Sequence, residues 1–177
     1  MIQIKEKFFV PYIDSTELDE RITVLAERIN SDYEGQPPPL FLVVLNGAFI
    51  FAAALLQRIQ IPCEVSFVKL ASYQQTASSG KVKQLIGLDE SIVGRHVVIV
   101  EDIVDTGLTM QQLTGQLQAL GAANVKVATL LHKPDATQND VHLDFVGFTI
   151  KNKFVVGFGL DYDGLGRNLP AIYVLAD

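Results

Sequence analysis

Three carboxylates follow one apolar run of this sequence. The β-branched run VVIV at 97–100 leads directly into Glu101 and Asp102, and Asp105 comes three residues later. Adjacent carboxylates at the end of a buried strand repel each other and are costly to desolvate unless a cation or hydrogen-bond donors reach them. A magnesium ion with its waters, or the hydroxyls of a ribose, would relieve that cost. The alternative is that these acids lie in a solvated loop, where they would need no ligand.

The residues after the acids favour the functional interpretation. Asp105-Thr106-Gly107-Leu108-Thr109 joins the strand to a predicted helix, and a helix N-terminus offers unpaired N–H groups and a positive dipole end to a phosphate. Gly107 lets the backbone approach an anion closely, and Thr106 and Thr109 add hydroxyl donors. Ordinary helix capping would explain Asp105 or Thr106 alone. Together, the pattern predicts acids that hold sugar and metal beside a loop that holds phosphate.

The elements around this motif predict an α/β fold. Apolar runs typical of buried strands lie at 40–45, 63–70, 95–100 and 125–131, and helical patterns lie at 18–29, from Asn46-Gly47 to about Ile59, and at 109–120. Thr16 and Asp19 have the spacing of a capping box before the first helix. Two more β-type runs, 145–150 and 154–160, precede a loop-like tail with a short last strand. This alternation predicts a parallel sheet flanked by helices, with ligands at the carboxyl ends of its strands.

Composition limits the possible partners. The chain has 177 residues, which suits one domain, and its net charge of −6 (14 Lys and Arg against 20 Asp and Glu) disfavours a nucleic-acid partner. The lone Cys63 cannot form an internal disulfide, which fits a reducing compartment. The apolar stretch 40–56 could be mistaken for a membrane helix, but the turn signal Asn46-Gly47 predicts a strand, a turn and a helix instead. The N-terminus has no signal-peptide form. We expect no membrane association.

The motif VVIVEDIVDTGLTM at 97–110 resembles the phosphoribosyl-pyrophosphate motif of the type I phosphoribosyltransferases. Four further pieces, LNGAFIF, the SYQQ loop, LLHKP and FVVGFGLDYDGLGRNLP, resemble the hypoxanthine-guanine phosphoribosyltransferases and occur in the right order. The resemblance implies one domain over 1–177, with a parallel β-sheet core at roughly 37–156 and a small hood made by the N-terminal segment and roughly 157–177. It also implies a cytoplasmic, Mg2+-dependent homodimer or homotetramer that converts hypoxanthine or guanine plus phosphoribosyl pyrophosphate to IMP or GMP plus pyrophosphate.

The resemblance assigns roles around phosphoribosyl pyrophosphate. It makes Asp105 the proton acceptor at purine N7 and gives Glu101 and Asp102 the ribose hydroxyls, directly or through magnesium. It wraps the 5′-phosphate with 105–109, namely Asp105, Thr106, Gly107, Leu108 and Thr109. It places pyrophosphate on Leu45, Asn46, Gly47 and Arg167, with a cis peptide before the Asn46 position in relatives. A mobile lid is expected at 72–84, which includes Ser72 and Tyr73.

The resemblance also assigns the purine end. Lys133 would donate to the 6-oxo group, which favours hypoxanthine and guanine over adenine. Phe154 would stack on the base, beside Lys153, Val155 and Asp161, and Asp161 would be the second metal ligand. From the residues alone, Phe154 would be assigned to core packing. A surface position is the commoner one for lysine, but the place of Lys133, after the buried run VATLL and before Pro134, favours a functional role.

The sequence departs from the family motifs at two positions. Many relatives carry Lys or Arg at the position of Asn46, so more of the pyrophosphate charge here would fall to magnesium, backbone amides and Arg167. Some relatives carry Lys at the position of Leu108, and the backbone cradle for the phosphate survives that change. His96, His132 and His142 are not spaced as a metal site.

Two alternative functions are considered. One alternative is an enzyme that prefers xanthine. The other is a non-catalytic sensor of phosphoribosyl pyrophosphate that regulates transcription or binds RNA, which the acidic charge disfavours.

Overall fold

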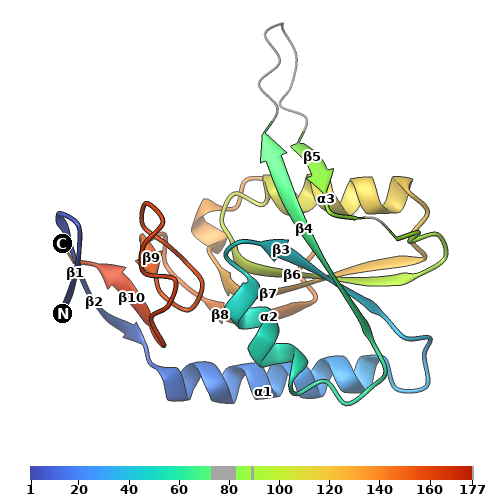
Figure 1. Ribbon diagram of the computed structural model, residues 1–177, viewed down its shortest axis with the longest axis horizontal. Coiled ribbons are helices and arrows are strands. Elements are labelled where there is room, and N and C mark those ends of the chain that lie inside the picture. Colours follow the sequence, from blue (N-terminus) through green and yellow to red (C-terminus); the bar gives the residue numbers. More distant parts are fainter. Residues whose placement is uncertain (73–82, 89, 177) are drawn as a thin grey trace, which may run out of the picture.

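The computed structural model describes residues 1–72, 83–88 and 90–176 and contains two sheets (Figure 1). The larger sheet has the strand order β5-β4-β3-β6-β7-β8. Its strands are β3 (Leu40–Leu45), β4 (Glu64–Ser72), β5 (Lys83–Ile86), β6 (His96–Val104), β7 (Asn124–His132) and β8 (Phe145–Thr149). The smaller sheet has the order β1-β2-β10-β9, with β1 (Ile2–Ile4), β2 (Lys7–Ile13), β9 (Val155–Val156) and β10 (Ile172–Leu175).

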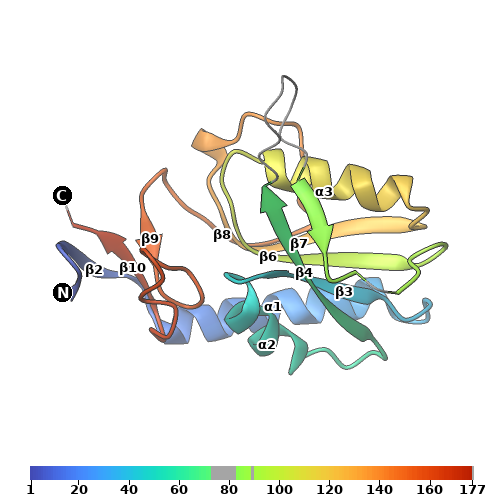
Figure 2. The same ribbon diagram turned by 45° about the horizontal axis from the view of Figure 1, so that its top comes forward.

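Helices cover both faces of the larger sheet, whose strands are parallel except for the edge strand β5. The helices α1 (Ser15–Asp32) and α2 (Phe49–Leu56) lie on one face, and α3 (Leu108–Ala119) lies on the other (Figures 1 and 2). Along β6, Val98 and Val100 pack on the α1–α2 side, and Val97 and Ile99 pack on the α3 side. Burial on both faces explains why the run 97–100 of this strand is wholly apolar. The predicted α/β fold is confirmed.

The first helix begins two residues earlier than the predicted capping box. Asp14 is the N-cap: its carboxylate accepts hydrogen bonds from the backbone N–H groups of Thr16 (2.8 Å) and Glu17 (2.9 Å). The Glu17 carboxylate accepts from the N–H of Asp14 in return, at 3.2 Å. The predicted box of Thr16 and Asp19 was therefore wrong, because Thr16 already lies inside the helix and Asp14 has the extended backbone that a cap needs.

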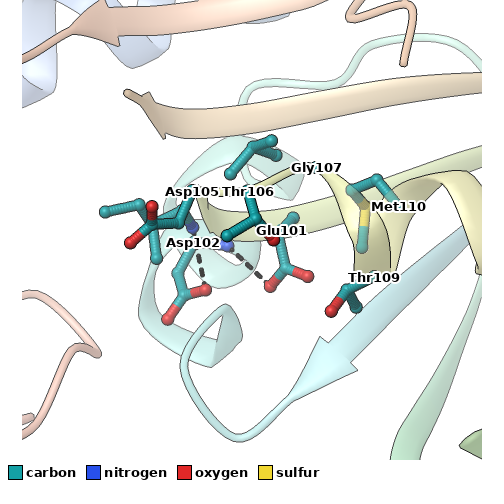
Figure 3. A pocket seen from close by; sticks show the side chains of 9 residues that line it. Glu101, Asp102, Asp105, Thr106, Gly107, Thr109 and Met110 are labelled. Carbon is teal, nitrogen blue, oxygen red and sulfur yellow. Dashed lines mark hydrogen bonds between the residues drawn. The ribbon is translucent and has the colours of Figure 1, made fainter. Parts of the chain in front are cut away.

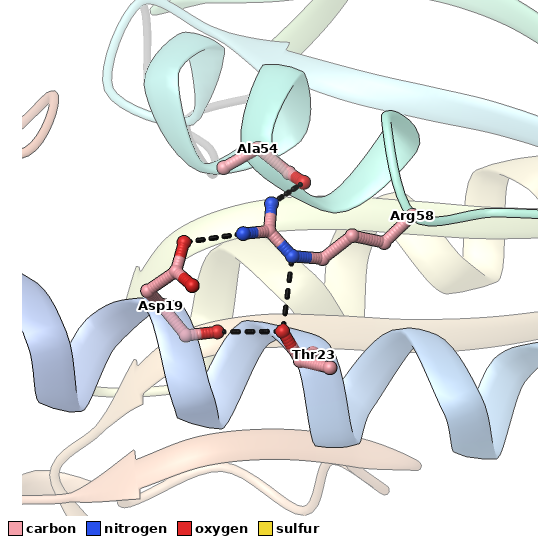
Figure 4. A network of polar contacts seen from close by, with 4 residues as sticks. All are labelled: Asp19, Thr23, Ala54 and Arg58. Carbon is pink, nitrogen blue, oxygen red and sulfur yellow. Dashed lines mark hydrogen bonds and ion pairs between the residues drawn. The ribbon is translucent and has the colours of Figure 1, made fainter.

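Asp19 instead takes part in a contact between the two helices on the same face (Figure 4). The Arg58 guanidinium pairs with the Asp19 carboxylate, donates to Thr23 Oγ1 at 3.0 Å and donates to the Ala54 carbonyl at 2.7 Å. The Thr23 hydroxyl donates in turn to the carbonyl of Asp19 at 2.9 Å. One side chain thus ties α1 to the end of α2.

The apolar stretch 40–56 forms β3, a turn and α2, as predicted. In the described part of the chain, no helix has the length and apolar character needed to cross a membrane. The helix α2 ends at Leu56, three residues before the predicted Ile59, because 57 and 58 form a turn.

The smaller sheet joins the two ends of the chain into the hood (Figure 1). β2 pairs with β10 in antiparallel register, with Val10 opposite Val174. The apolar run 154–160 gives only the two-residue strand β9, because Gly157 and Gly159 have φ angles of 102° and 105° and turn the chain into a loop.

The predicted loop 72–84 was too long at both ends. Ser72 is the last residue of β4, and Lys83 and Gln84 belong to β5, which pairs antiparallel with β4 and places Lys83 opposite Ser72. The rest of the predicted lid, 73–82 with Tyr73, lies outside the described residues.

Candidate active site

The register of two neighbouring parallel strands brings the predicted base and the predicted purine donor together. Val104 of β6 lies opposite His132 of β7, so Asp105 and Lys133 leave the sheet side by side. The N–H of Lys133 donates to the Val104 carbonyl at 2.9 Å, and its Nζ lies 3.2 Å from Asp105 Oδ2. The whole Lys133 residue is only 7% exposed, which agrees with a functional role and excludes an ordinary surface lysine.

A pocket of about 190 Å3 opens beside Asp105 (Figure 3). It is formed by the end of β6, the following loop and the first turn of α3, and its lining residues are Glu101, Asp102, Ile103, Val104, Asp105, Thr106, Gly107, Thr109 and Met110. The structure therefore gathers the predicted sugar-binding acids and the predicted phosphate loop around one cavity. Leu108, also assigned to the phosphate loop, begins α3 and is exposed.

The loop into α3 has the features of a phosphate cradle. Gly107 is the N-cap with a left-handed backbone (φ 81°), and as glycine it has no side chain with which to cap the helix. The nearby Thr106 hydroxyl reaches the N–H of Leu108 only at 3.4 Å. Side-chain capping therefore does not account for this turn, which presents the positive end of the helix dipole to the pocket.

The two adjacent acids are held by backbone donors. Glu101 is 7% exposed, and its Oε1 accepts from the N–H of Asp102 at 3.1 Å. Asp102 Oδ1 accepts from the N–H of Ile103 at 2.8 Å. These bonds fix the direction of both carboxylates at the pocket wall.

The predicted pyrophosphate loop lies directly against these acids. A Cβ atom built on Gly47 would fall 1.6 Å from Asp102 Oδ2, so the carboxylate occupies the space that any larger residue would need. The peptide bond between Leu45 and Asn46 is cis, as the resemblance implied, and Asn46 is exposed.

The loop of the hood between β9 and β10 lies against the other side of Gly47. A Cβ atom on Gly159 would lie 2.0 Å from the Gly47 carbonyl oxygen. From the same loop, Arg167 donates to the carbonyl of Gly159 at 2.7 Å and pairs with Asp161 at 2.6 Å. The predicted pyrophosphate ligand and the predicted second metal ligand thus contact each other. Among the described residues, no three His, Cys, Asp or Glu side chains gather as a metal cluster.

The aromatic residue assigned to base stacking stands at the surface of the hood. Phe154 is 44% exposed, so the core-packing interpretation was wrong, whereas its neighbour Val155 is buried. Tyr162 packs edge-on against Phe154 (5.9 Å between centroids, 86°), and Lys7 Nζ lies 5.6 Å from the Phe154 ring centre. Lys153 is exposed at the start of the same segment.

Sequence reasoning missed two groups of residues that support the site. Thr137 and Asn139, in the loop after β7, contact the backbone of the Asp105–Thr106 turn. In the hood, the Tyr162 hydroxyl donates to Glu6, which raises the pKa of the tyrosine and lowers that of the glutamate. No local pattern marks either group, because each contact joins residues that are far apart in the sequence or lie in irregular loops.

Comparison with known proteins agrees with this geometry. Residues 14–163 match the family model of the phosphoribosyl transferase domain. The chain belongs to the phosphoribosyltransferase family. It is 43% identical to the hypoxanthine-guanine phosphoribosyltransferase of Lactococcus lactis, over 92% of this chain and 88% of that protein. It is 41% identical to the enzyme of the same name from Bacillus subtilis, over 92% and 91%.

Solved structures place this phosphoribosyltransferase in the same branch. It superposes on a hypoxanthine phosphoribosyltransferase from Trypanosoma cruzi, in a ternary complex with substrates, with a TM-score of 0.88 at 33% identity, covering 98% of this chain and 97% of that one. A hypoxanthine phosphoribosyltransferase from Staphylococcus aureus gives a TM-score of 0.85 at 32% identity, covering 98% and 92%. The chain is a purine salvage phosphoribosyltransferase of the hypoxanthine-guanine branch.

Proposed function

We propose that this phosphoribosyltransferase joins hypoxanthine or guanine to phosphoribosyl pyrophosphate and releases IMP or GMP plus pyrophosphate. The observation that carries the proposal is the buried Lys133 amine beside the half-exposed Asp105 carboxylate. This carboxylate lines a pocket together with a helix N-terminus and two further acids. A donor for a carbonyl and an acceptor for a ring proton there match the 6-oxo and N7 edge of one purine.

In this reaction the chain acts on the base with two side chains. Lys133 Nζ donates to the 6-oxo group, and the Asp105 carboxylate accepts the N7 proton while purine N9 forms its bond to C1′ of the ribose. The bond between C1′ and the pyrophosphate oxygen breaks, and pyrophosphate leaves with its electron pair. The 3.2 Å contact between Lys133 and Asp105 holds both groups at one base edge before the base arrives.

The other residues are proposed to hold phosphoribosyl pyrophosphate. The loop Asp105–Thr109 takes the 5′-phosphate through backbone N–H groups and hydroxyls. Glu101 and Asp102 take the ribose hydroxyls, and the Leu45–Gly47 loop takes pyrophosphate. Asn46 brings no charge, so Arg167 contributes the cation, with its remaining N–H groups or after release from Asp161.

The donor set fits a magnesium ion that binds with its substrate. Mg2+ prefers hard oxygen ligands and is usually held by one or two protein carboxylates together with substrate phosphates and waters. Glu101 and Asp102 supply such oxygens next to the Gly47 loop. Bound there, the ion would neutralise charge on the leaving pyrophosphate. A second ion at Asp161 is part of this proposal.

At the purine end, Phe154 is proposed to stack on the base, with Lys153, Val155 and Asp161 around its other edges. The exposed ring of Phe154, held edge-on by Tyr162, supports this role. Ser72 and Tyr73 are proposed to belong to a lid over the reaction centre, since water must be kept from an oxocarbenium-like transition state.

Steady-state assays with hypoxanthine, guanine, xanthine and adenine test the proposed function. Turnover with hypoxanthine and guanine, and weak turnover with adenine, is the expected result. A clear preference for xanthine would favour that alternative enzyme. Tight binding of phosphoribosyl pyrophosphate without turnover of any base would favour the sensor.

We also propose a cytoplasmic homodimer or homotetramer. Val65 and Phe67 stand on the same face of β4 and are 42% and 50% exposed, which suits a contact with a second copy. Light scattering coupled to gel filtration tests this, and a monomer at micromolar concentration would contradict it.

A further inference from the structure

One hydroxyl lies between the backbones of the two residues proposed to contact the purine. Thr137 follows the short 3-10 helix η1 (Pro134–Ala136) after β7. Its Oγ1 is 2.9 Å from the carbonyl oxygen of Asp105 and 2.9 Å from that of Lys133. His132 Nε2 lies 3.1 Å from the same oxygen.

A threonine hydroxyl has a single hydrogen, so it donates to the two carbonyls in alternation or in a shared bond. Its lone pairs can accept from His132 when the ring carries a proton on Nε2. The loop that carries Thr137 is itself fixed to the phosphate turn, because Asn139 Nδ2 donates to the Thr106 carbonyl at 2.9 Å. The hydroxyl therefore joins the chain after β6 to the chain after β7, beyond the point where the strand pairing ends.

We propose that Thr137 is a positioning residue that sets the separation of Asp105 and Lys133, and hence the fit of a 6-oxopurine. This inference rests on the proposed function. A purine presents its 6-oxo group and N7 at a fixed spacing, so the acceptor and the donor must hold a matching spacing before the base binds. Without the Thr137 hydroxyl, the backbones of Asp105 and Lys133 lose their shared hydrogen-bond partner, and their side chains lose the matching spacing. In such a site a small displacement of a functional group strongly reduces the rate.

The test compares Thr137→Val, which keeps the shape but removes the hydroxyl, with Thr137→Ser, which keeps the hydroxyl. We expect the valine variant to raise KM for hypoxanthine about tenfold, the usual effect of one lost hydrogen bond, with KM for phosphoribosyl pyrophosphate within about twofold. The serine variant should restore the KM for hypoxanthine. Should Thr137→Val not fold, Thr137→Ala, which adds no atom, carries the same measurement.

The control is Thr23→Val, because the Thr23 hydroxyl makes the same kind of contact far from the site: it accepts from Arg58 and donates to a backbone carbonyl. That variant should lower Tm without changing either KM. A cycle with Lys133→Met tests the route of the effect, because Thr137→Val should matter less once the amine that it positions is absent.

Several results would overturn the inference. They are an unchanged KM for hypoxanthine in Thr137→Val, an equal rise in both KM values, a failure of serine to rescue, or full additivity with Lys133→Met. If the unaltered protein transfers no phosphoribosyl group, the proposed function itself falls and this inference falls with it. If the unaltered protein is active and Thr137→Val leaves KM for hypoxanthine unchanged, only this inference is overturned.

Discussion

At the scale of single residues, the pocket brings together three carboxylates from the end of β6 and the loop that follows it. The types and spacing of Glu101, Asp102 and Asp105 predict a sugar-phosphate site, and the structure places all three around one pocket. The sequence alone favoured the core for Phe154, and the structure leaves this residue 44% exposed. Burial of one side chain depends on where distant segments pack, and no local pattern carries that information.

Asp105→Asn isolates the proposed proton acceptor. An amide keeps the size of the carboxylate but cannot take up the N7 proton, so we expect kcat to fall roughly 100- to 10,000-fold, the range for loss of a general base. The Kd for phosphoribosyl pyrophosphate should stay nearly the same, because the backbone of the loop is untouched. Turnover like that of the unaltered enzyme would remove Asp105 from this role.

At the scale of elements, the strands and helices were predictable where their residues are buried on a regular period. The runs 40–45 and 125–131 became β3 and β7, and the 109–120 pattern became α3. Among the features that departed from expectation are the cap at Asp14, the strand β5 and the shortness of β9. Each depends on a competing local contact or on positive φ angles at Gly157 and Gly159, which hydrophobic periodicity does not report.

Gly47→Ala tests how closely the pyrophosphate loop must approach β6. The added Cβ would overlap Asp102 Oδ2, so the loop or the carboxylate must move. We expect kcat/KM for phosphoribosyl pyrophosphate to fall about 100-fold, as displacements near 1 Å do in other sites.

Gly115→Ala is the matched control. Gly115 lies inside α3, and nothing lies within 4 Å of its added Cβ. That variant should keep full activity and gain about 0.5–1 kcal/mol in the free energy of unfolding. Equal activity of the two alanine variants would show that the Gly47 contact is not needed.

The Glu6–Tyr162 hydrogen bond predicts a pH dependence for the hood. The bond lowers the pKa of Glu6 below its ordinary 4.5, so its stabilising effect is present above that pH and is lost as the pH falls through the lower, folded-state value. The bond raises the pKa of Tyr162 above 10, so the effect is also lost as the pH rises through that higher value.

Urea unfolding at a series of pH values measures this effect. Glu6→Gln and Tyr162→Phe should each be less stable than the unaltered protein at neutral pH, and both differences should shrink in acid. The size will be small, because both groups are exposed and solvent screens the contact. A difference that stays constant from pH 7 to below 4.5 would contradict the assignment.

At the scale of the whole molecule, the proposed site lies between the two sheets, which stand side by side in Figure 2. In this proposal the larger sheet supplies Asp105, Lys133 and the Gly47 loop, and the hood supplies Phe154, Asp161 and Arg167. The hood sheet pairs β2 from the start of the chain with β10 from its end. The resemblance implied this hood, but the sequence could not show how it packs on the larger sheet. Gly159 approaches the backbone of Gly47, and a contact between backbone atoms leaves no pattern in the sequence.

Gly159→Ala tests this contact between the hood and the Gly47 loop. A Cβ at this position would lie 2.0 Å from the Gly47 carbonyl oxygen, and the φ angle of 105° also disfavours alanine. We expect a lower Tm and a raised KM for phosphoribosyl pyrophosphate, because the clash pushes the Arg167 loop from the Gly47 loop. Gly164→Ala separates the two causes: its φ is 82° but nothing lies within 4 Å of the added atom, so it should cost about 1 kcal/mol in stability and leave KM unchanged. If both variants raise KM equally, backbone strain in the hood loop, and not its contact with the larger sheet, controls substrate binding.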